Sequence, residues 1–182
     1  MALEYVTLGW NVVGVAVLAF AALRAGSVAL AGFGLDSLIE IGASVVVVWQ
    51  LTGTNKDRER TAMRLIGAAF MALAVYIAVQ AVYVLARGDR PSVSGIGIVW
   101  IAITCAAMLG LAFGKARIGA ALKNPVLMTE GRVTLVDAYL AGAVLLGLLL
   151  NAASGWWWAD PLAGLVIVVY GVKEGWEALH HS

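Results

Sequence analysis

Three acidic residues stand inside apolar stretches of this 182-residue sequence. Asp36 and Glu40 lie in the segment GFGLDSLIEIGASVVVVW, and Asp137 lies in EGRVTLVDAYLAGAVLLG. The i, i+4 spacing places Asp36 and Glu40 on one face of a helix. An ionised acid inside a membrane costs free energy, about 2.5–3.5 kcal/mol for Asp at the centre of a helix. Acids kept at such positions bind a cation, carry protons, or do both.

The composition indicates the elements that must hold these acids. The chain is 62% hydrophobic and 13% charged, whereas about a quarter of the residues in a soluble domain are charged. Four uncharged runs have about the length of a spanning helix: Tyr5–Leu23, Leu65–Ala86, Pro91–Gly114 and Ala138–Ala159. Two further spans, interrupted by acids, are expected near Ser27–Gln50 and Pro161–Leu179. Because lipid cannot satisfy an open sheet edge, we predict an all-α membrane protein with six transmembrane helices in a single domain over residues 1–182.

Basic residues predict the orientation of this bundle. The segment between the second and third spans contains Lys56, Arg58, Arg60 and Arg64, and the segment after the fourth span contains Lys115, Arg117 and Lys123. The positive-inside rule then places both loops and both termini in the cytoplasm. We therefore predict a multi-pass protein of the cell membrane. In the segment ADPLAGL, Asp160 is expected to cap the sixth helix, with Pro161 in its first turn.

The three acids are predicted to lie at one depth. With a rise of about 1.5 Å per residue, Asp36, Glu40 and Asp137 all fall within one or two turns of the bilayer centre. This arrangement indicates a cation site at the midplane, formed between the second and fifth helices. Small residues on both helices were expected to bring them close at a spacing typical of membrane helix pairs: Gly34, Gly42, Ala138 and Gly142.

Further polar residues are candidates for accessory roles. Thr134 and Glu130 precede Asp137 by three and seven positions, so they project to about the same side of the fifth helix. Glu130 could give the cation access from the cytoplasm, or it could be neutralised by Arg132. Thr134 could reach the site, or it could bond to its own helix. Asn11 in the first helix could be a ligand or could form a hydrogen bond between helices.

Three segments resemble helices of the cation diffusion facilitator transporters: SVALAGFGLDSLIEIGASVVVVW, TEGRVTLVDAYLAGAVLLGLLL and WWWADPLAGLVIVVYGVKEGWEAL. The resemblance covers nearly the whole chain and implies exchange of a divalent metal for protons. It also implies that Asp36, Glu40 and Asp137 are the metal ligands. The fourth ligand position of the family falls on Val133, which cannot coordinate a metal. No counterpart of the cytoplasmic C-terminal domain of many members is expected here, and the resemblance implies a homodimer.

The donor atoms of the predicted site favour certain metals and indicate protons as the counter-ion. Three carboxylates with Thr134, Asn11 or water form an oxygen-rich site, which favours harder cations such as Mn²⁺ or Fe²⁺. Zinc sites usually include nitrogen or sulfur, yet zinc also accepts carboxylates, so Mn, Fe and Zn all stay open. Without metal, one or two of the crowded acids would hold protons. A metal arriving from the cytoplasm would displace these protons, which predicts metal/proton antiport.

Other classes of function were weighed against transport. The absent fourth ligand would also suit a non-transporting protein that keeps the fold, either a membrane metal sensor or a partner subunit. No arrangement of a serine, cysteine or histidine nucleophile is present in the spans, so an enzyme is not expected. The single cysteine, Cys105, excludes an internal disulfide and a thiolate cluster. A formal net charge of +1 gives no indication of nucleic-acid binding.

Overall fold

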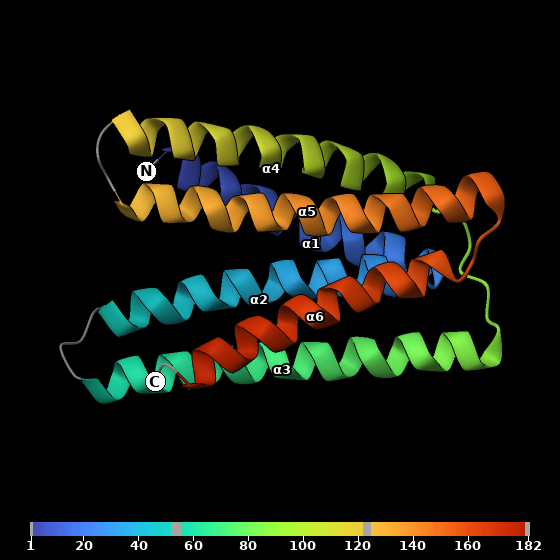
Figure 1. The fold of residues 1–182 in the computed structure, drawn as a ribbon, viewed down its shortest axis with the longest axis horizontal. Helices are drawn as coiled ribbons and strands as arrows, with labels where there is room; N and C mark the ends of the chain where they lie inside the picture. Colours follow the sequence, from blue (N-terminus) through green and yellow to red (C-terminus); the bar gives the residue numbers. More distant parts are fainter. Residues whose placement is uncertain (1, 52–55, 122–124, 181–182) are drawn as a thin grey trace.

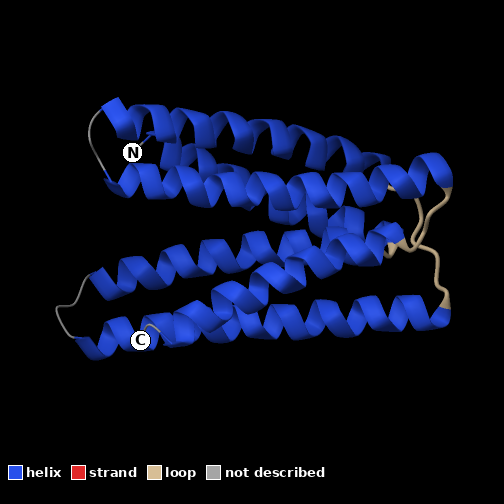
Figure 2. Cartoon of the chain, in the orientation of Figure 1, coloured by secondary structure: helices blue, strands red, loops and turns tan. Residues whose placement is uncertain are grey.

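The structure is a computed structural model that describes residues 2–51, 56–121 and 125–180. These residues form six α-helices and no strand (Figures 1 and 2). The helices are α1 (Ala2–Ala25), α2 (Val28–Leu51), α3 (Lys56–Arg87), α4 (Gly95–Ala121), α5 (Pro125–Ser154) and α6 (Ala159–His180). The predicted all-α fold is confirmed. The fifth helix starts at a proline, whose fixed φ suits the first helical position.

Four of these helices are long and apolar enough to cross a membrane. The candidate spans among the described residues are Leu8–Ala25, Arg64–Arg87, Gly95–Ala121 and Val133–Ser154. The helices run roughly parallel to one long axis of the molecule (Figure 1). The start of α1 and the end of α6 lie at the same end of this bundle. The chain is therefore a multi-pass membrane protein whose helices alternate in direction.

Three tight turns at the opposite end of the bundle depend on glycine. Gly26, Gly88 and Gly155 directly follow α1, α3 and α5, and each has a positive φ of 64°, 69° and 66°, respectively. The amide of Gly26 donates to the carbonyl of Ala22 at 2.8 Å, and the amide of Gly155 donates to that of Asn151 at 3.0 Å. Such left-handed residues satisfy the last carbonyls of a helix, and only glycine adopts them without steric cost.

The helices pack mainly as two close pairs, α4 with α5 and α3 with α6. In the centre, α2 contacts α1, α3, α5 and α6 (Figure 1). The core around it contains fully buried aliphatic side chains such as Ile77, Ile101 and Ile167. Among these packed pairs, α2 and α5 share the smallest contact. The two helices that carry the acids are thus held mostly by their other neighbours.

The α5–α6 contact depends on Gly147, which predicts a specific packing defect. A Cβ at this position would lie 2.7 Å from the Cβ of Ala163 and 2.9 Å from the carbonyl oxygen of Ala159. Neither atom can move aside by rotating a side chain, so we expect Gly147→Ala to destabilise the protein by about 1–3 kcal/mol. Thermal unfolding of the purified protein in detergent measures this loss.

Gly142 on the same helix supplies the matched control. Among the described residues, nothing lies within 4 Å of where a Cβ on Gly142 would sit. Alanine is the better helix former, so Gly142→Ala should keep or slightly raise the unfolding temperature. Equal unfolding temperatures for the two variants would contradict the close approach of α5 and α6.

Asp160 joins the start of α6 to the start of α2. Its side chain is fully buried, at 0% exposure. One carboxyl oxygen accepts hydrogen bonds from the amides of Val28 at 2.9 Å and Ala29 at 3.3 Å, and the other accepts from the Ser27 hydroxyl. The Ser27 oxygen in turn accepts from the amide of Leu30 at 3.1 Å. Ser27 and Asp160 together satisfy the free amides at the start of α2.

The prediction that Asp160 caps its own helix is therefore wrong. The helix α6 begins one residue earlier, at Ala159. Backbone carbonyls serve its first turn instead: the amide of Ala159 donates to Trp156 at 2.9 Å, and the amide of Leu162 donates to Trp158 at 3.2 Å. With these donors satisfied locally, the Asp160 carboxyl group is available to the neighbouring helix.

Candidate metal centre

The helix α2 presents Asp36 and Glu40 from one face, as their spacing predicts. Asp36 is 2% exposed, and Glu40 is partly buried. Within the described part of the chain, the Oδ1 atom of Asp36 is buried and has no hydrogen-bond partner. Such an atom in a native interior calls for a ligand or a proton, because an unsatisfied buried acceptor is costly. Asp36 therefore has a buried oxygen atom available to a cation. In the described chain, Oδ1 of Asp137 is likewise buried without a hydrogen-bond partner, although Asp137 itself bonds to Glu40.

The helix α5 presents Asp137 and Thr134, one turn apart and both buried. A side-chain hydrogen bond links Glu40 to Asp137 across the contact between α2 and α5. The proximity of the second and fifth helices predicted from depth is thus present in the fold. Two carboxyl groups can form a hydrogen bond with each other only when one of them carries a proton. A hydrogen bond at this contact therefore requires that either Glu40 or Asp137 be protonated.

Asn11 of α1 holds Glu40 from the other side. Its Nδ2 atom donates to Oε2 of Glu40 at 3.0 Å, which is the hydrogen bond between helices that the sequence left open against a ligand role. The neighbouring residue Trp10 fixes α1 against α4: its ring stacks on Trp100 at a centroid distance of 5.2 Å, and its Nε1 donates to Thr104 at 3.1 Å. Glu40 is thus positioned by α1 as well as by α5.

The acids are not drawn into one coordination sphere. Among the described residues, no three His, Cys, Asp or Glu side chains gather closely enough to hold a metal ion. Glu40 instead bonds to Asp137 and to Asn11. A divalent cation that used all three acids would have to replace the hydrogen bond between Glu40 and Asp137.

Lys115 is the residue of this region that the sequence interpretation misplaced. It was counted as a loop charge at the cytoplasmic side, but it lies within α4 and is 1% exposed. Its Nζ atom donates to Oγ1 of Thr134 at 3.2 Å. Lys115 belongs to a stripe of residues on α4 that the structure shows to be buried, which consists of Gly97, Ile101, Thr104, Met108, Ala112, Lys115 and Gly119. The nearly uniform apolar sequence of this helix contains no signal for this stripe.

Other predicted features of α2 and α5 have different surroundings. A Cβ on Gly34 would lie 3.1 Å from Leu18, so Gly34 accommodates α1 and not α5. The would-be Cβ atoms of Gly42 and Gly142 meet no described atom within 4 Å. The prediction that these glycines bring α2 and α5 together is therefore wrong. Glu130, the proposed access carboxylate, lies outside the residues whose side chains the structure describes.

Val133 does not point into the buried network. Its side chain is 46% exposed, whereas Thr134 and Asp137 are 2% and 8% exposed. A histidine at this position would place its ring on the outer side of α5. We therefore expect Val133→His to leave the preference between Mn²⁺ and Zn²⁺ unchanged in a competition assay of metal uptake. A clear shift toward zinc, which prefers nitrogen donors, would show that this face of α5 turns into the site.

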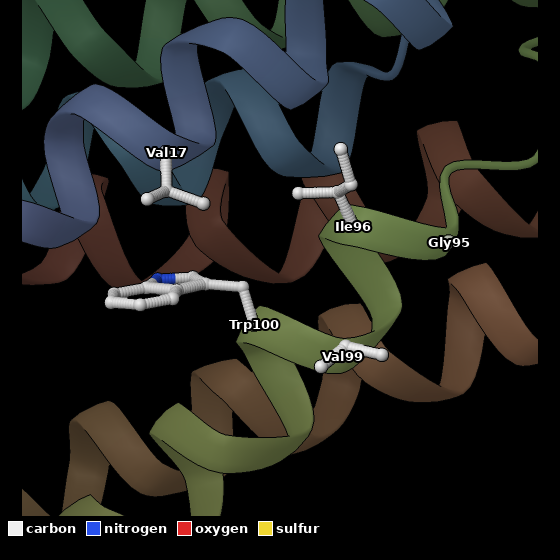
Figure 3. A pocket seen from close by; sticks show the side chains of 5 residues that line it. All are labelled: Val17, Gly95, Ile96, Val99 and Trp100. Atoms are coloured by element: carbon white, nitrogen blue, oxygen red, sulfur yellow. The ribbon is translucent and has the colours of Figure 1, made fainter.

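A groove lies between α1 and α4. It is lined by Val17, Gly95, Ile96, Val99 and Trp100. Figure 3 shows Val17 of α1 above the Trp100 ring of α4. All five residues lack a charged group, so this groove offers a cation no ligand.

A bundle of membrane-spanning helices with buried carboxylates on two of them is typical of membrane proteins with an internal ion or proton site. The sequence matches the cation efflux transmembrane domain over residues 5–182, which is essentially the whole chain. The chain belongs to this family. The family is one of divalent cation transporters, and this member is a multi-pass membrane protein.

Proposed function

We propose that this protein exports a divalent metal cation from the cytoplasm in exchange for protons, through a site formed by Asp36, Glu40 and Asp137. The hydrogen bond between Glu40 and Asp137 is the observation that supports this proposal most directly. It joins two helices through a proton that a metal ion would have to displace. Metal binding and proton release are then alternatives at the same oxygen atoms, which is the requirement for coupled exchange.

Each residue has a definite part in this cycle. Asp36 offers its buried Oδ1 atom to the arriving cation. The cation then separates Glu40 from Asp137, and Asn11 keeps Glu40 in place while its second oxygen turns to the metal. Thr134, Asn11 or water completes the oxygen ligands. Rocking at the small α2–α5 contact exposes the site outward, where protons return.

The donor set bears on the choice of metal. Every candidate ligand offers oxygen, because the exposed Val133 supplies no fourth donor. Oxygen ligands favour Mn²⁺ or Fe²⁺ over softer partners, and Zn²⁺ remains a candidate because it accepts carboxylates. We propose a transport role and no enzymatic step.

The proposed topology has six spans, with both termini in the cytoplasm of a cell-membrane protein. The start of α1 and the end of α6 lie at one end of the bundle, which supports an even number of spans (Figure 1). Exposed basic residues such as Arg64 and Arg117 favour the cytoplasm for this end. Because Lys115 is buried, it no longer counts among the charges that indicate the cytoplasmic end. The exposed basic residues still favour the same orientation. A homodimer is proposed from the family resemblance.

One observation favours a second candidate function. The described residues hold no ready cluster of three metal ligands, and this would suit a metal sensor or a partner subunit that does not transport. Both proteins would bind metal, so binding alone does not separate them. Only the transporter would couple metal movement to proton movement.

Flux in proteoliposomes tests the proposal. The full chain is reconstituted with a metal-sensitive dye and a pH-sensitive dye, and Mn²⁺, Fe²⁺, Zn²⁺ and Co²⁺ are offered in turn. Metal movement with opposite proton movement is expected for at least one of these ions. Metal binding without flux for any ion would support the sensor or subunit, and the absence of both would overturn the site.

A further inference from the structure

The interior of this membrane protein contains a lysine ammonium group. Lys115 is 1% exposed and ranks among the largest fully buried side chains of the described chain. It lies on the buried stripe of α4, so its side chain does not reach the surface as long basic side chains usually do. Removing an ammonium group from water is strongly unfavourable unless a negative charge compensates it. The fold must therefore supply that charge nearby.

The surroundings of Lys115 identify the compensating groups. Its hydrogen bond at 3.2 Å goes to the hydroxyl of Thr134, which is neutral and cannot balance a charge. Thr134 lies one turn before Asp137 on α5, and Asp137 bonds to Glu40. An electrostatic interaction also links Lys115 to Glu40 directly. The negative charges within reach are thus the carboxylates of the candidate metal centre.

We propose that Lys115 is a built-in counter-charge of the carboxylate site and makes its charge match one divalent cation. When all three acids are ionised, three carboxylates and one ammonium leave a net charge of minus two. One divalent cation brings this total to zero. A monovalent or trivalent cation would leave a net charge in a low-dielectric interior, where it is costly. This inference rests on the proposed function, since it uses the same three acids.

A double-mutant cycle on metal binding tests the inference. Mn²⁺ and Zn²⁺ binding is measured on the full chain in detergent at fixed pH for wild type, Glu40→Gln, Lys115→Met and the double variant. In the presence of Lys115, Glu40→Gln leaves the metal-loaded site one charge too positive, and we expect roughly a hundredfold loss of affinity. Without Lys115 the loaded site is again neutral, so the loss should shrink to roughly tenfold.

Two further variants separate the effect of the Lys115 charge from the effect of its hydrogen bond to Thr134. Lys115→Gln keeps a hydrogen-bond donor toward Thr134 but has no charge, and it should reduce the Glu40→Gln loss as Lys115→Met does. Arg117→Met removes an exposed charge from the same helix, and the Glu40→Gln loss should remain roughly a hundredfold in its presence. If Lys115→Gln instead leaves the Glu40→Gln loss at its wild-type size, the hydrogen bond to Thr134 and not the charge is responsible, and the inference is overturned.

Thermal unfolding without metal keeps the test independent of the proposed function. At a mildly alkaline pH, at which the proton shared by Glu40 and Asp137 is lost, Glu40→Gln alone should lower the unfolding temperature, because it takes negative charge away from the buried ammonium. Adding Lys115→Met should restore part of that loss. Additive losses in both the metal-binding and the metal-free cycles would overturn the counter-charge. If wild type binds none of the offered metals, the proposed function fails, and the metal-free cycle alone decides whether Lys115 and Glu40 are paired.

Discussion

Asp137→Asn is expected to abolish metal-driven proton movement in proteoliposomes, with a loss of at least a hundredfold. A unit charge about 4 Å from an opposite one contributes about 4 kcal/mol at an effective dielectric constant of 20, and a divalent cation would lose twice this. The substitution also removes the acid that shares a proton with Glu40. An asparagine amide can still donate to Glu40, so the fold should survive while the exchange site does not.

The same experiment on Asp36 and on a surface acid makes the result specific. Asp36→Asn should cause a comparable loss, because its buried Oδ1 atom is the group offered to the cation. Asp89→Asn changes an exposed residue in the turn after α3 and should leave flux unchanged. Flux that survives both Asp36→Asn and Asp137→Asn in folded protein would eliminate the proposed site.

Asp160→Ala should strongly destabilise the protein. The fully buried carboxyl group accepts from the amides of Val28 and Ala29 and from the Ser27 hydroxyl. Its removal leaves these donors without a partner at the start of α2, in a region that water does not reach. Each such group costs about 1–3 kcal/mol, so we expect a total loss of about 3 kcal/mol or more, measured by thermal unfolding in detergent.

Asp160→Asn is the intermediate variant for this prediction. The amide oxygen can still accept from Val28 and Ala29, while its NH₂ group faces the Ser27 hydroxyl, so the variant should unfold between wild type and Asp160→Ala. Metal affinity of the folded protein should stay near that of wild type, since Asp160 takes no part in the proposed site. An unfolding temperature equal to wild type in Asp160→Ala would refute its role as the cap of α2.

In this fold, the helix contacts that provide most of the packing differ from the contact at which transport is proposed. The close pairs α4–α5 and α3–α6 depend on glycines and small side chains, whereas α2 and α5 share only a small contact. The candidate metal centre lies at that small contact. A change at this contact therefore disturbs few packing interactions, and the Asp160 cap at one end of α2 keeps the helix anchored while it occurs.

Much of the architecture is a local property of the sequence. Helices are the form in which an apolar segment satisfies its backbone inside lipid, so the uncharged runs predict α1, α3, α4 and α5 directly. The spacing of Asp36 and Glu40 predicts their shared face for the same reason, because it depends only on helical geometry. The contact of Glu40 with Asp137 agrees with the common depth that helix length and direction predict for these two residues.

The partners across helices depend on how each helix is rotated and where it ends, and these are decided by packing. Lys115 reads as a loop charge because it follows an apolar run, yet α4 continues through Ala121 and turns Lys115 inward to Thr134. Asp160 reads as a cap for its own helix, and only the approach of α2 assigns it to Ser27. Val133 and Asp137 are four residues apart, but the rotation of α5 exposes the first and buries the second. The sequence by itself determined the helices and the spacing of the acids along them, while the tertiary structure alone decided which charges meet, because that choice depends on contacts between segments far apart in the chain.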